Sequence, residues 1–153
     1  MSALELKIPP PVLTALFALV IWGISLTSPQ IDYPAELRLI LGVGFAALGL
    51  CCILSGGWYF NKASTTVNPL KPNTSSALVQ NGVYAFSRNP MYLGLSLGLL
   101  GWTLYLTAPL GVLGIAGFMI TITRLQIIPE ERALKELFGQ EFTAYQEKVR
   151  RWI

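Results

Sequence analysis

Between Arg88 and Arg124 the chain reads NPMYLGLSLGLLGWTLYLTAPLGVLGIAGFMITIT, a stretch of 35 residues without a charged side chain. A helix rises about 1.5 Å per residue, so roughly 20 apolar residues cross a hydrocarbon core about 30 Å thick. The stretch is too long for one crossing, and Thr107-Ala108-Pro109 near its middle supplies a turn. The pattern predicts a hairpin of two membrane helices, from about Pro90 to Leu106 and from about Pro109 to Ile128.

Two further uncharged runs lie upstream, 24 residues at 8–31 and 23 residues at 39–61. They predict membrane helices from about Pro10 to Thr27 and from about Glu36 to Phe60. The composition agrees, because 53% of residues are hydrophobic and only 12% are charged, whereas about a quarter are charged in soluble domains. We therefore expect an all-α integral membrane protein with four transmembrane helices, forming a single domain over residues 1–153.

The basic residues predict the orientation of these helices. Ten of the eleven Lys and Arg residues lie in the N-terminal region, the loop before the hairpin and the C-terminal region, and only Arg38 lies beside the first connection. By the positive-inside rule, both termini and that loop face the cytoplasm. We expect a multi-pass protein of the inner membrane. No basic patch interleaved with aromatic residues indicates a nucleic-acid partner.

The two halves of the chain differ in character. Residues 1–60 predict two scaffold helices, and residues 61–153 carry almost every polar feature. Small residues recur at spacings of three and four and predict close helix packing at Gly42, Gly44, Gly49, Gly94, Gly98, Gly101, Gly111, Gly114 and Gly117. The loop from Asn61 to Asn89 contains turn dipeptides such as Asn81-Gly82, and a loop of this length in so small a protein is typically functional.

A further helix is predicted to begin after Pro129, because Glu130 and Glu131 are favourable in a first turn. Apolar residues then repeat at three and four from Leu134 to Trp152, and Gly139 predicts a kink. Two interpretations stay open for this C-terminal amphipathic helix. It lies on the lipid headgroups at the cytoplasmic face, or it folds over the cytoplasmic mouth of the bundle as a lid.

Charged residues converge at one rim of the predicted bundle. Arg124 is the ionisable residue expected inside a span, where a charge costs roughly 2.5 to 3.5 kcal/mol at the bilayer centre unless the side chain snorkels to the interface. Arg88 begins the neighbouring span, and Glu130 and Glu131 follow Arg124 by less than two helical turns. Two arginines with two glutamates suit a zwitterionic ligand, because an arginine binds a carboxylate and a glutamate binds an ammonium group.

Four motifs follow one another in order over residues 60–153: Thr65-Thr66-Val67-Asn68-Pro69 with Leu78 to Tyr84, Ser87 to Gly94, Glu130 to Leu134, and Phe138 to Tyr145. This ordered set resembles the isoprenylcysteine carboxyl methyltransferase and phospholipid methyltransferase family, whose members are integral membrane enzymes. The chain departs from the family pattern at Asn89, where many members have histidine, and at Ser64, where the loop motif often begins with glycine.

The resemblance implies that S-adenosylmethionine binds between the last helices and the C-terminal segment, without a soluble Rossmann fold. Carried over residue by residue, it implies a cofactor site formed by Tyr84, Arg88, Asn89, Pro90, Tyr92, Gly94, Glu130 and Glu131. The catalytic candidates are Arg124, as the partner of a carboxylate, and Glu130 or Tyr145, as bases if the acceptor must lose a proton. No metal is expected, because displacement at a sulfonium mainly requires alignment and exclusion of water.

We expect an S-adenosylmethionine-dependent enzyme that methylates a lipophilic acceptor arriving through the membrane. A prenylcysteine-like carboxylate ranks above a phospholipid amine or a small lipophilic thiol or amine, because a carboxylate needs no base and the chain has no histidine. A small four-helix transporter is the rival of another class, although only Glu36 places an acid even at the edge of a span. A non-catalytic scaffold, which would not bind the cofactor, is the third possibility, and the oligomeric state stays open.

Overall fold

The computed structural model describes residues 4–64 and 72–153, which form helices and turns without a strand. The predicted all-α fold class is confirmed. The motif Thr65 to Pro69 lies outside the described residues. In chain order the elements are α1 (Pro10–Thr27), α2 (Ala35–Lys62), η1 (Pro72–Thr74), η2 (Gly82–Ala85), α3 (Pro90–Tyr105), η3 (Pro109–Gly111), α4 (Val112–Ile122), the π-helical turn η4 (Thr123–Ile127) and α5 (Ile128–Lys148).

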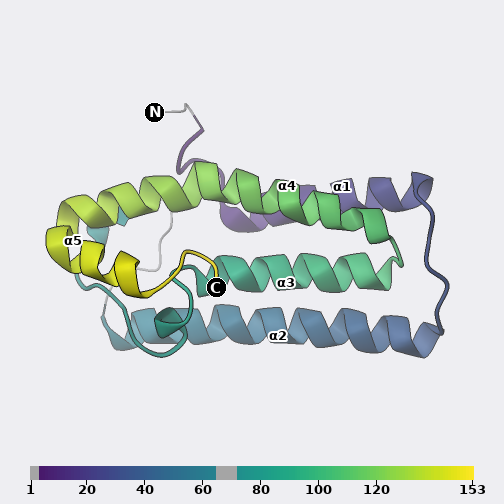
Figure 1. The fold of residues 1–153 in the computed structure, drawn as a ribbon, viewed down its shortest axis with the longest axis horizontal. Helices are drawn as coiled ribbons and strands as arrows, with labels where there is room; N and C mark the ends of the chain where they lie inside the picture. The colour runs from purple at the N-terminus through teal and green to yellow at the C-terminus, as the bar shows by residue number, and fades with distance from the viewer. Residues whose placement is uncertain (1–3, 65–71) are drawn as a thin grey trace.

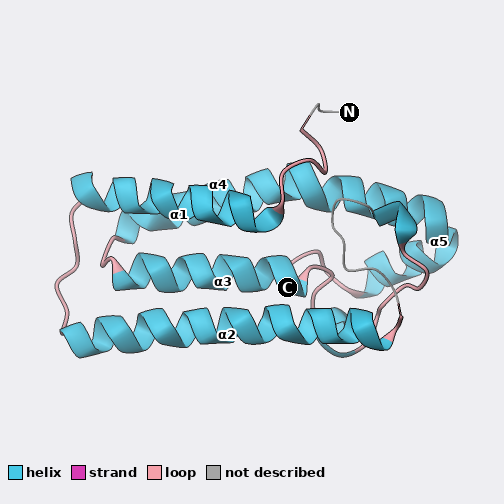
Figure 2. Cartoon of the chain, turned by 180° about the vertical axis from the view of Figure 1, so that it is seen from behind, coloured by secondary structure: helices cyan, strands magenta, loops and turns pink. Residues whose placement is uncertain are grey.

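The long helices run side by side, with α3 between α2 on one side and α1 and α4 on the other (Figures 1 and 2). Residues 4–9, residues 72–89 before α3, and α5 all lie at the same end of this bundle. Three helices within the described residues are long and apolar enough to cross a membrane: α1, α2 and the continuous helix Pro109–Lys148. Since α3 has 16 residues, the count of four spans stays a prediction.

Glycines allow α2 and α3 to approach each other closely. A Cβ atom added to Gly49 would lie 2.4 Å from the carbonyl oxygen of Gly94, and one added to Gly101 would lie 2.6 Å from that of Gly42. Side chains at these positions would separate the helices, so the predicted packing seam is confirmed there. Two other glycines expected in the packing have open space around a Cβ atom: Gly44 and Gly98.

The helix that begins at Pro109 continues through Pro129, so the prediction of a new helix starting after that proline is wrong. A proline within a helix has no N–H for the carbonyl four residues earlier, which here is that of Leu125. The backbone N–H of Leu6 donates to this carbonyl instead, at 3.0 Å. The fully buried Gln126 also donates from Nε2 to the carbonyl of Ile8, at 2.6 Å. The N-terminal segment thus supplies the hydrogen-bond donor that the helix lacks at the proline.

At Gly139 the chain leaves helical geometry, with φ 52° and ψ −118°, which confirms the predicted kink. Beyond this point α5 turns back across the end of the bundle (Figure 1). Most of the apolar face beyond the kink is buried, because Phe142, Tyr145 and Val149 form a cluster against which Leu78 also packs. This arrangement matches the lid alternative for the C-terminal segment.

Candidate active site

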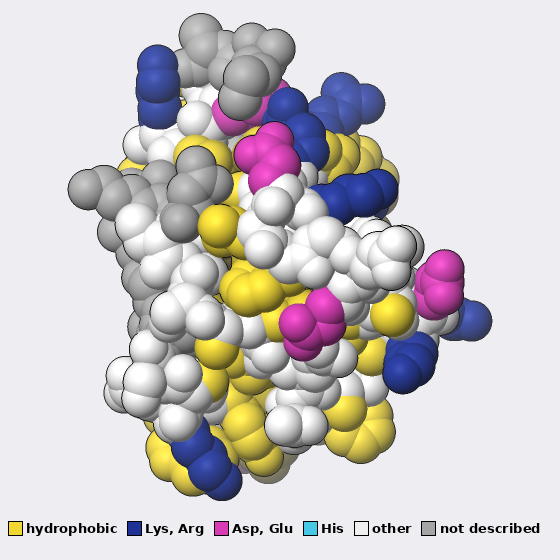
Figure 3. Space-filling model, turned by 90° about the vertical axis from the view of Figure 1, so that its left-hand side faces the viewer, with side chains coloured by type: hydrophobic (Ala, Val, Ile, Leu, Met, Phe, Trp, Pro, Cys, Tyr) yellow, Lys and Arg dark blue, Asp and Glu magenta, His cyan; other side chains and the backbone are white. Residues whose placement is uncertain are grey.

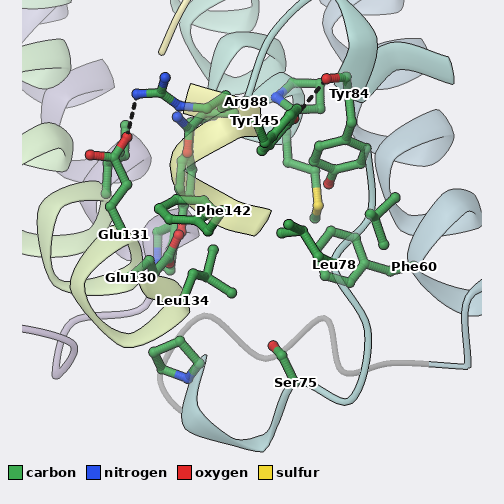
Figure 4. A pocket seen from close by; sticks show the side chains of 18 of the residues that line it. Phe60, Ser75, Leu78, Tyr84, Arg88, Glu130, Glu131, Leu134, Phe142 and Tyr145 are labelled. Atoms are coloured by element: carbon green, nitrogen blue, oxygen red, sulfur yellow. Dashed lines mark hydrogen bonds and ion pairs between the residues drawn. The ribbon is translucent and has the colours of Figure 1, made fainter. Parts of the chain in front are cut away.

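A cavity of about 340 Å³ lies at the end of the bundle covered by α5 (Figure 4). Its volume falls in the range of roughly 300 to 1,000 Å³ that is common for small-molecule sites. On this end of the molecule, charged side chains of both signs surround exposed hydrophobic atoms (Figure 3). The cavity wall includes apolar residues from α2, the loop, α3, η4 and α5: Ile53, Phe60, Leu78, Val79, Met91, Leu95, Ile127, Leu134 and Phe142.

Most of the residues predicted from the sequence come together around this cavity. Eight of them line it: Tyr84, Arg88, Asn89, Pro90, Tyr92, Glu130, Glu131 and Tyr145. Two others do not line it. Gly94 packs against α2 in the glycine seam, and Arg124 is exposed on η4. The helices predicted as scaffold also contribute, since Pro10 of α1 and Phe60 of α2 form part of the wall.

Arg88 joins the start of α3 to the C-terminal end of α5. Its Nη1 donates to the carbonyl oxygens of Gln146, at 3.1 Å, and Val149, at 2.7 Å. Such carbonyls at the end of a helix lack partners within the helix, and a cation also suits this end of the helix dipole. Nη2 donates to Oε1 of Glu131 at 2.8 Å, whereas the buried Nε has no partner among the described residues.

Glu131 lies between two arginines. Besides accepting from Arg88, it accepts from Arg151 Nε at Oε1, 3.1 Å, and from Arg151 Nη2 at Oε2, 2.7 Å. The three side chains together carry one net positive charge. The sequence does not identify Arg151 as a site residue, because basic residues at the end of an amphipathic helix are equally expected to contact lipid headgroups. No local pattern could reveal it, because its partner lies 20 residues earlier, on the other side of the Gly139 kink.

Glu130 has a different environment. Its carboxylate accepts a hydrogen bond from the Tyr92 hydroxyl, which joins α5 to α3. Among the described residues, no lysine or arginine forms an ion pair with it. The cavity therefore borders a net positive cluster of Arg88, Glu131 and Arg151 through its first two members, and it contains the separate acidic side chain of Glu130.

Two tyrosines close the side of the cavity nearest the loop. The Tyr145 hydroxyl donates to the carbonyl oxygen of Tyr84 at 2.6 Å (Figure 4), and the Tyr84 ring packs edge-on to Phe60 at 5.3 Å between centroids. Burial, and then the proximity of Tyr145 and Glu130, raises the pKa of the Tyr84 hydroxyl above its ordinary value. Tyr84 is therefore a neutral phenol at physiological pH.

The turn that carries Tyr84 requires glycine. Gly82 has φ +63°, and a Cβ atom there would lie 1.9 Å from the ring of Tyr59. Both the left-handed backbone and the close contact exclude other residues without a rearrangement. The turn predicted at Asn81-Gly82 is thus confirmed.

Asn89 occupies the N-cap position of α3 but makes no capping hydrogen bond with its side chain. Its Nδ2 instead donates to the carbonyl oxygen of Arg151 at 2.9 Å, and the backbone N–H of Arg88 donates to that of Arg150 at 3.1 Å. We call residues 149–153 the C-terminal strap. The start of α3 holds this strap in place, and Figure 1 shows the C-terminus beside it.

These features define a class of protein: a multi-pass helical membrane protein with a cavity for a small molecule at one end of its bundle. The model of one family, phospholipid methyltransferase, matches residues 37–141. The chain belongs to this phospholipid methyltransferase family, which agrees with the resemblance found in its motifs.

Three relatives extend this comparison. The chain is 48% identical over 63 residues to an uncharacterized protein of Haemophilus influenzae, a match covering 41% of this chain and 100% of that protein. It is 29% identical over 122 residues to the protein-S-isoprenylcysteine O-methyltransferase of Xenopus laevis, covering 78% of this chain and 40% of the relative. The Saccharomyces cerevisiae protein of the same name is 34% identical over 79 residues, covering 52% and 33%. The chain thus spans well under half of these two enzymes.

Proposed function

We propose that this protein transfers a methyl group from S-adenosylmethionine to the carboxylate of a lipophilic, prenylcysteine-like acceptor. One observation carries the proposal: eight of the ten site residues predicted from the sequence line a single cavity of about 340 Å³ at the end of apolar helices. The names of the two isoprenylcysteine O-methyltransferase relatives support the choice of a carboxylate acceptor.

The residues of the cavity fit the cofactor in charge and in shape. Arg88 brings a guanidinium to the wall of the cavity, where it suits a carboxylate, and Glu130 offers a carboxylate for a cationic group. Aromatic rings of Phe60, Tyr84 and Phe142 line the same cavity, and the faces of such rings attract cations. S-adenosylmethionine carries a carboxylate, an ammonium group and a sulfonium, and when bound it supplies an electrophilic methyl group.

The protein's own part in this reaction is to align the two substrates and exclude water. An acceptor carboxylate is already anionic, so no proton has to move before its oxygen attacks the methyl carbon. The end of α5 packs over this end of the bundle, and the mostly apolar wall offers water few polar partners. Exclusion of water favours such a displacement, because it strengthens the electrostatic contacts that hold the substrates in position.

The membrane gives the acceptor its path. Exposed large hydrophobic side chains cover α1 and α2, as expected for surfaces in lipid, and the cavity wall includes Pro10 of α1 with Ile53 and Phe60 of α2. We propose that the protein lies in the inner membrane and that the acceptor enters from the bilayer. This end of the bundle then faces the cytoplasm, where the cofactor is available.

An amine of a phospholipid is the second candidate acceptor, and Glu130 favours it. This carboxylate has no cationic partner among the described residues, so it could accept the proton that an amine releases when its nitrogen gains a methyl group. Tyr145 fits this role less well, because its hydroxyl already donates to the Tyr84 carbonyl.

Radiolabelled methyl transfer with purified protein tests both candidates. A base-labile methyl ester on a prenylcysteine analogue is the expected product, and base-stable label on phosphatidylethanolamine would favour the amine. Glu130→Gln should lower transfer to either acceptor, since it removes the carboxyl group that would bind a cationic group of the cofactor or accept a proton. The matched control is Glu136→Gln, which changes an exposed glutamate of the same helix. Intact folded protein that neither binds S-adenosylhomocysteine nor transfers methyl groups would contradict the proposal.

A further inference from the structure

The contacts of Glu131 indicate a role other than direct binding of a ligand. Both of its carboxylate oxygens are engaged, Oε1 by Arg88 and Arg151 and Oε2 by Arg151. Its side chain is 13% exposed and that of Arg88 is 11% exposed, so these contacts are largely shielded from solvent. Glu131 is therefore a bridge between two arginines, one that lines the cavity and one that does not.

The contacts of Arg88 with the described residues use only part of its hydrogen-bonding capacity. An arginine has five N–H donors, and three of those of Arg88 donate to Gln146, Val149 and Glu131. The guanidinium also lines the cavity. It therefore keeps donors for a further acceptor that approaches it from the cavity.

The charges indicate the chemistry of this acceptor. Two arginines share the single carboxylate of Glu131. Arg88 otherwise donates to backbone carbonyls, and Arg151 is partly exposed. One further carboxylate would balance the cluster. On the proposed function, the carboxylate of the amino-acid portion of S-adenosylmethionine has this chemistry.

Arg151 limits how Arg88 contacts Glu131. An isolated arginine and carboxylate prefer a bidentate pair, in which two N–H groups of one edge meet both oxygens. Arg151 already contacts both oxygens of Glu131, through Nε and Nη2. Arg88 is thereby limited to a single bond through Nη2. Without Arg151, Arg88 could form the bidentate pair with Glu131 and would have fewer donors left for a ligand.

We propose that Arg151 is a positioning residue: acting through Glu131, it limits Arg88 to one bond with that carboxylate and so keeps the guanidinium of Arg88, which lines the cavity, available for the carboxylate of the bound cofactor. The C-terminal strap fixes Arg151 itself. Its carbonyl oxygen accepts from Asn89 at 2.9 Å, and the neighbouring Arg150 carbonyl accepts from the backbone of Arg88 at 3.1 Å. The inference rests on the proposed function, because it assigns one group of that function's cofactor.

Calorimetry with two ligands tests this role on the full chain in detergent. The ligands are S-adenosylhomocysteine and its decarboxylated form, which differ only in the carboxylate. Arg151→Ala should weaken S-adenosylhomocysteine binding on the order of tenfold and change binding of the decarboxylated form by less than about twofold. Arg151→Lys should be intermediate, because an ammonium group cannot span both oxygens as the guanidinium does. Arg150→Ala is the matched control, since it removes a neighbouring exposed side chain and keeps the backbone carbonyl.

The outcomes distinguish a failure of the Arg151 inference from a failure of the proposed function. Equal weakening of both ligands by Arg151→Ala would make Arg151 a purely structural residue and overturn the inference, as would unchanged binding of both. In either case binding by the wild-type protein would still support the proposed function. Wild-type protein that binds neither ligand would overturn the proposed function and this inference with it. Retained binding of the decarboxylated form by Arg151→Ala would itself report that the variant is folded.

Discussion

The hydroxyl of Tyr92, in the first turn of α3, donates a hydrogen bond to the carboxylate of Glu130, in the first turn of α5. This contact joins two helices whose chain positions differ by 38 residues, and it does so at the wall of the cavity. Because no cation pairs with Glu130 among the described residues, the phenol is the partner that fixes its position.

Tyr92→Phe should therefore weaken binding of S-adenosylhomocysteine. A hydrogen bond in a folded protein contributes roughly 0.5 to 1.5 kcal/mol, so we expect a loss of about two- to tenfold in affinity, measured by calorimetry. Tyr105→Phe is the control, because Tyr105 is a largely exposed residue at the other end of α3. Unchanged affinity in Tyr92→Phe would show that Glu130 does not need this partner.

The glycine seam predicts a contrast in stability between two alanine substitutions in α2. Gly49→Ala places a Cβ atom 2.4 Å from a backbone oxygen of α3, so the helices must separate and the melting temperature should fall by several degrees. Gly44→Ala meets nothing within 4 Å and should be neutral or stabilising by roughly 0.5 to 1 kcal/mol, as expected for alanine in a helix. Thermal unfolding in the same detergent compares the two, and equal melting temperatures would contradict the close packing.

Pro129 predicts a change at a distant position in the chain. Pro129→Ala supplies an N–H that competes for the Leu125 carbonyl, which now accepts from Leu6. Hydrogen exchange at the amides around Leu6 should become faster, although the helix itself gains a bond. Pro109→Ala is the control, because that proline lies at the first position of its helix, where a missing N–H has no consequence. Protection at Leu6 that survives in Pro129→Ala would mean that the N-terminal segment is held by other contacts.

Single cysteines test the orientation in the membrane. In a background without Cys51 and Cys52, both of which are free thiols, we would place one cysteine at Asp32 and, in a second protein, one at Asn81. Both positions are exposed and lie at opposite ends of the bundle. A membrane-impermeant reagent should label Asp32→Cys in intact cells and Asn81→Cys only after permeabilisation, as the distribution of basic residues predicts. The reverse pattern would move the cavity to the other side of the membrane.

Much of the fold is visible in the sequence because the membrane imposes simple rules. The predicted bounds of α1, Pro10 and Thr27, coincide with those of the helix. The predicted hairpin turn at Thr107-Ala108-Pro109 lies between α3 and α4. The continuity of the helix through Pro129 could not be predicted in this way. A proline is tolerated there because Leu6 supplies the missing donor, and no local pattern reveals a partner more than a hundred residues away.

The site was predictable to the extent that its residues belong to contiguous motifs. Arg88 and Glu130 stand within such motifs, and both line the cavity. Arg151 does not, and its role depends on the Gly139 kink that folds the strap back onto α3. Arg124 was selected for its depth in the membrane. Depth does not determine which side of a helix a residue occupies, and Arg124 is exposed.

The π-helical turn η4 also determines the direction in which later side chains project around the axis of the longest helix. A π turn closes its hydrogen bonds over one residue more than an α turn, so it is equivalent to one residue inserted into an α-helix. Deleting a residue within Thr123–Ile127 can be absorbed by a return to α-helical geometry, with Glu130 still directed at the cavity. The same deletion within α4 would rotate everything after it by about 100°. Through this turn, the lipid-facing surface of α4 and the cavity-facing surface of α5 are set independently of each other.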